Sequence, residues 1–248
     1  MAWAQEAKIK ARGIQTAPIN IKGLISAMPE LRKMTVLKPK EFCPKIKKCL
    51  ADCGIALVFL PHLKGSFLQG ASFMDGNKIV VGLTARGKDA DKFWFSLFHE
   101  LAHIALGHVG QPNGTSEEDE KAADKWSGNT LIITEAFEIF RIDSDYSERS
   151  VLKFAKEQGI APGIVVGRMQ LERMIKYSML NNLKEKYEIA VPNLQKHGFT
   201  PQPESAHNPK PTLPYCLPLP FPAQVPVLTL TGLPLCRWPT TLAPNISI

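Results

Sequence analysis

Residues 93–106, which read FWFSLFHELAHIAL, decide the fold of this chain. Apolar side chains fill nearly every position, so the stretch predicts a helix that is buried almost all round. His99 and His103 are four residues apart and therefore lie on one face of that helix, one turn from each other. Two histidines and Glu100 inside a buried helix would be costly polar groups without partners, and a metal ion with its bound water removes that cost.

Residues 99–103, HELAH, have the HExxH spacing of zinc peptidases. Two imidazoles at this spacing can bind one zinc ion at about 2.0–2.1 Å each. Glu100 is rotated by one residue, so we expect it to reach a water on the open coordination position and to act as the general base. The competing interpretation is that both histidines are core residues satisfied by backbone carbonyls. The buried helix around the motif disfavours it.

A third ligand is needed, and His108 is one candidate because it follows His103 by five residues. The metzincin pattern, however, requires glycine three residues and histidine six residues after the second histidine. Those positions are Leu106 and Val109 here, so that pattern fails. We therefore interpret His108 as a helix-end residue beside Gly107, where a cation suits the helix dipole.

Glu120 is the better candidate, because it lies in the next predicted helix, which begins EEDEKAADKW at residue 117. Glu120 and Asp124 are four residues apart and share one helix face. Two histidines and this glutamate form a His₂Glu set with an open fourth position. Asp124 can accept a hydrogen bond from a ligating imidazole and fix its tautomer. An acidic first turn by itself indicates only a solvated helix cap, and we expect that role for Glu117 and Glu118.

HELAHIALGH followed by EKAADKW resembles the ImmA/IrrE family of metallopeptidases, whose pattern is HExxH followed by ExxA(D/N)x(F/W)A. The resemblance implies a zinc-dependent hydrolase with zinc on His99, His103 and Glu120, and with Glu100 as base. It also implies limited proteolysis of a bacterial or phage transcriptional repressor as the protein partner. One departure is Ser127, which stands where alanine is usual in the family.

The predicted elements run in the order helix, small antiparallel sheet, further helices, which indicates an α+β, zincin-like fold. We expect the strand at residues 78–83 to pair with an extended substrate peptide by edge addition. The expected helices lie at residues 5–12, 21–28, 30–34, 40–53, 89–107, 117–131, 147–158 and 162–180, and the strands at 55–60, 66–74 and 78–83.

Three parts are expected along the chain: a helical lead-in or linker at residues 1–39, the metallopeptidase domain at 40–191, and a Pro-rich disordered tail at 192–248. Residues 201–248 hold 12 prolines, which exclude a regular helix or sheet. That tail is either a ligand for a groove-binding module or a translated frameshift segment. Flanking stretches resemble family members fused to an N-terminal helix-turn-helix, but none fits before residue 40, so we expect the catalytic part alone.

The composition indicates the cellular compartment and the classes of partner that this protein could have. The net charge is +7, but lysine and arginine are scattered, which favours a solvated basic face over direct nucleic-acid binding. Five cysteines occur without a CxxC pair, which indicates reduced thiols rather than a disulfide framework. The sequence has no secretory signal and no run of eighteen apolar residues. We therefore expect a cytoplasmic protein without a membrane span.

Two questions stay open on the sequence alone. The residue that stabilises the oxyanion beside the metal could be His108, Tyr146, Arg168 or Tyr177, although a structural ion pair is favoured for the arginine and packing for the tyrosines. The alternative function is a non-catalytic module of the antitoxin or regulator type that retains the peptidase fold. A nucleic-acid-binding protein driven by charge would show salt-dependent DNA affinity instead.

Overall fold

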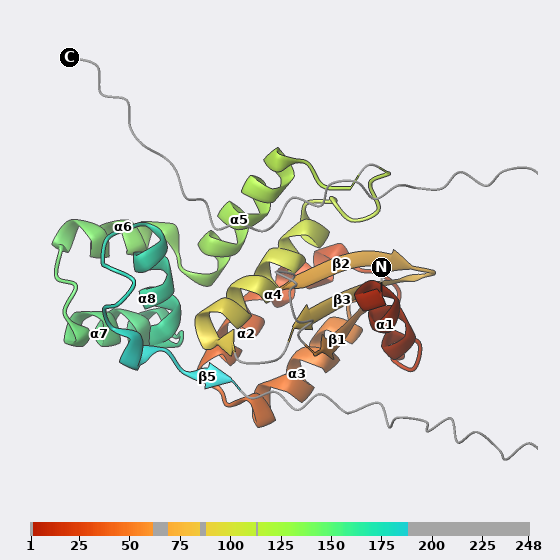
Figure 1. The fold of residues 1–248 in the computed structure, drawn as a ribbon, viewed down its shortest axis with the longest axis horizontal. Helices are drawn as coiled ribbons and strands as arrows, with labels where there is room; N and C mark the ends of the chain where they lie inside the picture. The colour runs from red at the N-terminus through yellow and green to blue at the C-terminus, as the bar shows by residue number, and fades with distance from the viewer. Residues whose placement is uncertain (1, 62–68, 85–87, 113, 188–248) are drawn as a thin grey trace, which may run out of the picture. The chain divides into compact units, whose positions relative to one another are not determined.

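The computed structural model describes residues 2–61, 69–84, 88–112 and 114–187. Figure 1 labels the elements. The helices are α1 (Ala2–Ala11), α2 (Ile21–Lys33), α3 (Pro39–Ala51), α4 (Ala90–Ala105), α5 (Glu117–Leu131), α6 (Thr134–Asp143), α7 (Glu148–Gln158) and α8 (Pro162–Leu171), with short 3₁₀ turns η1 (Met34–Val36) and η2 (Asn181–Leu183). The strands are β1 (Ile55–Leu60), β2 (Gly70–Asp75), β3 (Lys78–Thr84), β4 (Lys88–Asp89) and β5 (Lys186–Tyr187).

The α+β fold is the one predicted, but its main sheet is mixed rather than purely antiparallel. The strand order is β1-β3-β2, with β3 in the centre. β2 and β3 form the predicted hairpin, whose turn uses Gly76 at a positive φ of 63°. β1 pairs with β3 in parallel, with Ile55 opposite Ile79. β1 and β3 therefore run in the same direction, and β2, the strand between them in the sequence, lies at the opposite edge of the sheet from β1.

The central place of β3 corrects one expectation. The strand at residues 78–83 cannot receive a substrate peptide, because its backbone is hydrogen-bonded to β1 on one side and to β2 on the other. The edges of this sheet, within the residues that the structure describes, are β1 and β2. Of these two, β2 packs the more closely against α4, the helix that carries the HExxH motif. β2 is therefore the sheet edge that lies beside that motif.

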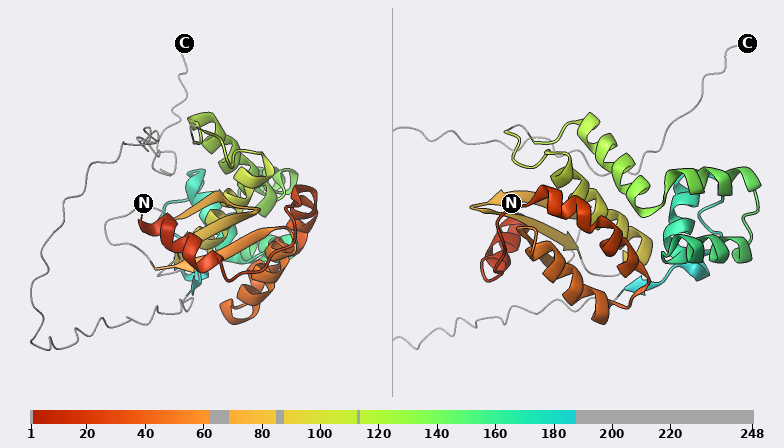
Figure 2. Two further views of the ribbon diagram at one scale, coloured as in Figure 1. Left: turned by 90° about the vertical axis from the view of Figure 1, so that its right-hand side faces the viewer. Right: turned by 180° about the vertical axis from the view of Figure 1, so that it is seen from behind.

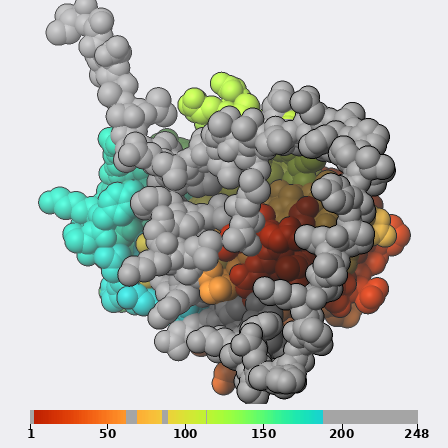
Figure 3. Space-filling view, turned by 45° about the vertical axis from the view of Figure 1, so that its right-hand side comes forward, coloured from red at the N-terminus to blue at the C-terminus, as the bar shows by residue number. Residues whose placement is uncertain are grey.

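Both faces of the sheet are covered, which explains why every residue of β1 is buried. Alternate side chains enter different cores: Ile55, Leu57 and Phe59 join the core with α3 and α4, and Ala56, Val58 and Leu60 join Trp3, Ala7 and Ala11 of α1. A methyl group on Gly82 would lie 2.7 Å from the Trp3 ring, so glycine is needed for α1 to pack on β3. Figure 2 shows α1, in dark red, on this face, and Figure 3 shows the dark red atoms of α1 in a space-filling view.

The first helices belong to the same packed unit as the sheet. α1 contacts β1 and β3, and α2 contacts α3, α4 and α5. α2 is one helix that continues through Pro29, where a break was expected. Proline removes only one backbone hydrogen bond from the helix, and burial of Leu24, Met28 and Leu31 on one face of α2 offsets that loss.

Three further features differ from the prediction or lie outside the residues that the structure describes. α6 was not predicted. The helix expected to reach residue 180 ends at Leu171, because the side chain of Gln170 donates to the carbonyls of Tyr177 and Met179 and organises an irregular segment. The predicted boundary at residue 192 and the Pro-rich tail lie outside the described residues. Within the described ranges, no helix is both long and apolar enough to span a membrane.

Candidate metal centre

α4 supplies the two histidines, and the way it ends adds a third. Gly107 follows the helix at a positive φ of 77°, and its backbone N–H donates to the carbonyl of Ile104. The N–H of His108 donates to the carbonyl of His103 over 2.8 Å. These two bonds form a Schellman motif, which reverses the chain at a helix end. As a result, the His108 ring lies against the His103 ring instead of leaving the site.

α5 supplies the acidic residues, and its start is fixed by a capping box. The Ser116 hydroxyl accepts from the backbone N–H of Asp119, and the Asp119 carboxylate accepts from the backbone N–H of Ser116. α5 packs against α4, with Ala123 fully buried as a small residue in the helix. Because the cap fixes the first turn of α5, it also fixes the position along α4 at which the Glu120 side chain lies.

Three ligand atoms converge between the two helices. The Nε2 atoms of His99 and His103 are 3.0 Å apart. Glu120 places Oε2 at 3.2 Å from His99 Nε2 and Oε1 at 3.5 Å from His103 Nε2. Ligand atoms about 2.05 Å from a tetrahedral zinc ion lie about 3.3 Å from one another. The separations of the three predicted ligand atoms therefore fit three corners of such a tetrahedron.

The tautomer of the neutral His99 ring favours a positive ion between the three ligand atoms. Its Nδ1 lies 2.8 Å from Oδ1 of Asp124, the residue predicted to fix its tautomer. An ionised carboxylate can only accept, so the neutral His99 ring carries its proton on Nδ1 and presents the lone pair of Nε2 to the cluster. A lone pair that faces another imidazole and a carboxylate is stabilised by a positive ion. The donor set thus fits a divalent metal such as zinc.

Glu120 is held in its ionised form. Burial opposes its ionisation, but hydrogen bonds with His103, His99 and Thr115 outweigh that effect and keep the pKa of Glu120 well below its ordinary value. The Thr115 hydroxyl donates to Glu120 Oε1 over 2.6 Å. The carboxylate is therefore charged and oriented, as a metal ligand must be.

Glu100 lies between the cluster and the edge strand β2. Its side chain is buried, with 6% of the residue exposed. Burial raises the pKa of Glu100, against the attraction of His99 and His103 and a hydrogen bond with Ser72 of β2. A methyl group built on Gly70 would lie 2.7 Å from Glu100 Oε1. Strand β2 thus passes directly over the carboxylate, which has room only because residue 70 is glycine.

Three of the four candidates for the oxyanion role make their described contacts elsewhere. Tyr146 donates its hydroxyl to the Arg141 carbonyl. Arg168 donates to Glu172 and to the carbonyls of Gly128 and Ile132, so it has the structural role that was favoured for it. Tyr177 is 65% exposed and lines a different pocket, described next. Only His108 lies at the cluster.

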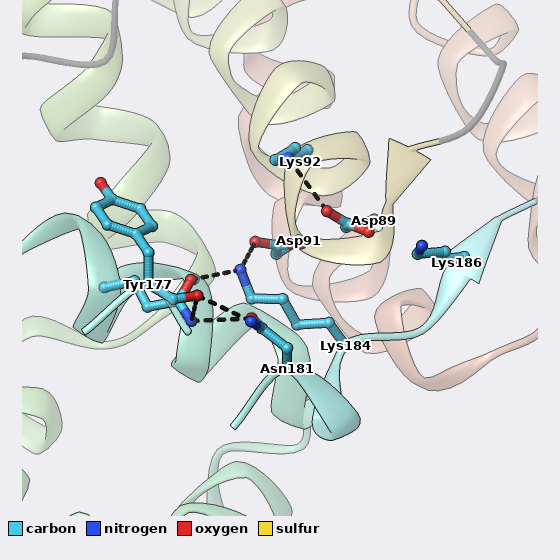
Figure 4. A pocket seen from close by; sticks show the side chains of 9 residues that line it. Asp89, Asp91, Lys92, Tyr177, Asn181, Lys184 and Lys186 are labelled. Atoms are coloured by element: carbon cyan, nitrogen blue, oxygen red, sulfur yellow. Dashed lines mark hydrogen bonds and ion pairs between the residues drawn. The ribbon is translucent and has the colours of Figure 1, made fainter. Parts of the chain in front are cut away.

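A pocket of about 550 Å³ lies at the N-terminal end of α4, and its lining includes none of the cluster residues. Lys184 Nζ lies 2.7 Å from Asp91 Oδ2 and 2.8 Å from Gln170 Oε1. Figure 4 shows the ammonium group of Lys184 pointing toward Asp91. Close by, Trp94 Nε1 donates to the Tyr187 hydroxyl over 3.0 Å. These buried polar contacts fasten the segment after α8 to α4, so their role is to hold the helix that carries the histidines.

Sequence reasoning named His108 as a candidate but missed its contact with His103, and it missed the roles of Asp119, Gly70 and Ser72. A histidine directly after a helix-ending glycine is a signal that could have placed His108 against His103, because the Schellman motif returns that position to the last turn. Asp119 could have been found as the third helical residue after Ser116, a position that completes a capping box. Nothing in the local pattern shows which strand covers Glu100.

A buried HExxH helix beside a mixed sheet, with a glutamate ligand from the following helix, defines the class of HExxH metallopeptidases. Residues 54–170 match the family model Peptidase_M78, described as the IrrE N-terminal-like domain. This part of the chain is a metallopeptidase domain of the ImmA/IrrE family. It extends from Gly54 at the start of β1 to Gln170 in α8 and contains every residue of the cluster. A comparison with curated proteins finds no match.

Proposed function

We propose that this chain is a zinc-dependent metallo-endopeptidase in which His99, His103 and Glu120 hold the metal and Glu100 is the general base. The observation that carries the proposal is the convergence of three ligand atoms at separations of 3.0–3.5 Å, with a buried carboxylate beside them. Burial of the Glu100 carboxylate costs stability, and a buried group that carries such a cost favours a functional use. A position next to the open coordination site gives it one.

The chemistry follows from these positions. Zinc bound here would polarise the scissile carbonyl and bring the pKa of its water to about 7. Glu100 then takes the proton of that water and delivers it to the leaving amine. Asp124 holds the His99 ring in the tautomer that binds metal. In this scheme Glu100 is the group that carries the proton, and His99, His103 and Glu120 serve as ligands.

Strand β2 is the element that would bind the substrate backbone. It is an edge strand in the described part of the sheet, and it lies over Glu100. An extended peptide can add to such an edge through backbone hydrogen bonds, which would place a peptide bond beside the open corner of the metal site. This assigns to β2 the role first expected for residues 78–83.

The first test is the metal content of the full chain after dialysis, measured by elemental analysis with His103→Ala and Glu100→Gln beside the wild type. We expect about one zinc per chain in the wild type and in Glu100→Gln, and little in His103→Ala. Cleavage of a quenched fluorescent peptide mixture should fall at least about 10³-fold in Glu100→Gln, because the base is removed while the metal stays. Full cleavage by Glu100→Gln would show that another group acts as base.

The proposed substrate is a transcriptional repressor, cut at one exposed linker, in a reducing cytoplasm. Support for the compartment comes from Cys43, Cys49 and Cys53, which are free thiols, with burial raising the pKa of each. The test is incubation with purified helix-turn-helix repressors and mass spectrometry of the products. Cleavage at one bond by the wild type and not by Glu100→Gln supports it. Zinc binding without cleavage of any peptide or repressor would favour the non-catalytic module.

A further inference from the structure

His108 and Asp119 lie behind the metal-facing side of His103, where no ligand atom is needed. His103 Nδ1 is 3.0 Å from His108 Nδ1, and His108 Nε2 is 3.2 Å from Asp119 Oδ1. The three side chains form a chain of contacts that runs from α5 to α4. The side chains of His103 and His108 are 6% and 10% exposed, so water does not replace these contacts easily.

Asp119 determines which ring nitrogen carries the proton in His108 and, through it, in His103. A carboxylate only accepts hydrogen bonds, so the neutral His108 ring must carry its proton on Nε2 and keep a lone pair on Nδ1. That lone pair can accept only if His103 carries its own proton on Nδ1. His103 Nε2 is then unprotonated and faces His99 Nε2 and Glu120. The opposite order would set the lone pair of His108 Nε2 against the carboxylate of Asp119.

Asp119 is itself held in place and charged. Its Oδ2 accepts from the backbone N–H and the hydroxyl of Ser116, while Oδ1 contacts His108. The bond from the Ser116 backbone, followed by the Ser116 hydroxyl, keeps the pKa of Asp119 below its ordinary value. The same carboxylate therefore closes the capping box of α5 and anchors the second histidine ring.

We infer that His108 is a positioning residue which, with Asp119, fixes the tautomer and orientation of His103 for metal binding. Asp124 does the same directly for His99, so each ligating histidine is oriented by a carboxylate of α5. The inference deepens the proposed function and rests on its metal centre. Partners of this kind typically contribute 10–100-fold to metal affinity.

The experiment measures the zinc affinity of the full chain by competition with a chromophoric chelator. His108→Leu should weaken zinc binding by about 10–100-fold. His108→Gln should recover most of that loss, because its amide offers one acceptor and one donor. The control is Leu131→Ala at the other end of α5, which leaves a cavity in the core and should keep wild-type zinc affinity.

A spectroscopic measurement separates positioning from a merely structural role. With ¹⁵N-labelled histidine in the zinc-loaded chain, NMR should show the His103 proton on Nδ1 and the His108 proton on Nε2. The His103 Nδ1 proton should exchange faster with water in His108→Leu. Unchanged zinc affinity in His108→Leu, or a His108 proton on Nδ1, would overturn the inference. Loss of zinc affinity in His108→Leu in a chain that cleaves no peptide would overturn the peptidase proposal and leave this one standing.

Discussion

Replacement of Gly70 by alanine tests whether the position of Glu100 limits catalysis. The new methyl group would lie 2.7 Å from Glu100 Oε1, and ordinary contact begins at 3.4 Å, so the carboxylate has to retreat by about 0.7 Å. A misplacement near 1 Å can cost about 10²-fold in rate. The methyl group would also lie 2.9 Å from Glu100 Cγ and 2.9 Å from Cδ2 of the buried Leu83, so these side chains must shift too and some stability is lost. We expect cleavage to fall by about 10–100-fold at full zinc occupancy.

The assay compares peptide cleavage, bound zinc and the urea midpoint in the wild type, Gly70→Ala and Gly128→Ala. Gly128 is the matched control, because an added methyl group there meets only Phe95, at 4.0 Å. Its activity should stay within about twofold of the wild type, since no crowding follows. A Gly70→Ala protein that keeps both its zinc and its full rate would refute the placement of Glu100 as base. Loss of zinc would show instead that the crowding reaches His99.

Three further predictions concern stability. Removal of zinc by a chelator should lower the melting temperature by about 5–10 °C relative to protein in free zinc at 100 times its Kd, because that binding contributes about 2.7 kcal/mol. Arg168→Met should lower the free energy of unfolding by about 3–5 kcal/mol in urea titrations. The substitution removes the buried guanidinium that donates to two carbonyls at the end of α5 and lies over the Phe137 ring. A loss below about 1 kcal/mol would contradict this structural role. Burial raises the pKa of Tyr187 to about 12, so the folded state keeps this proton longer than the unfolded state, whose pKa is about 10. Stability from Tyr187 is complete below pH 10 and should fall by about 2–3 kcal/mol as the pH rises to 12, a loss that Tyr187→Phe should not show.

The metal cluster could be predicted from sequence because its information is local. The spacing of His99 and His103 fixes a common face through the helical period alone. The helix at residues 117–131 was predicted with the bounds that the structure has, because its acidic first turn marks the start, and Glu120 lies in that turn. Sites of this kind depend on helix phase, which a sequence states directly.

The strand order and the residues behind His103 depend on contacts that a sequence states only indirectly. Residues 55–60 and 79–83 are both continuous apolar runs, which is typical of strands buried on two faces, whereas β2 has mixed polarity. Pairing with a substrate was nevertheless expected at the wrong strand. The hairpin signal predicts that β2 pairs with β3, but it does not predict that β1 pairs with the other side of β3. His108 was interpreted from the helix dipole, whereas the turn at Gly107 decides its position.

The edge of β2 has a consequence for which proteins this site could cut. Backbone hydrogen bonds to an edge strand read the conformation of a peptide more than its side chains. A segment already in a helix or in the interior of a sheet has no free backbone groups to offer. Substrates would therefore be selected by how readily a stretch of chain opens, a local unfolding free energy that ranges from about zero in loops to the full stability of a domain. If the proposed peptidase activity holds, a linker between two folded domains would be cut, and the domains on either side would survive.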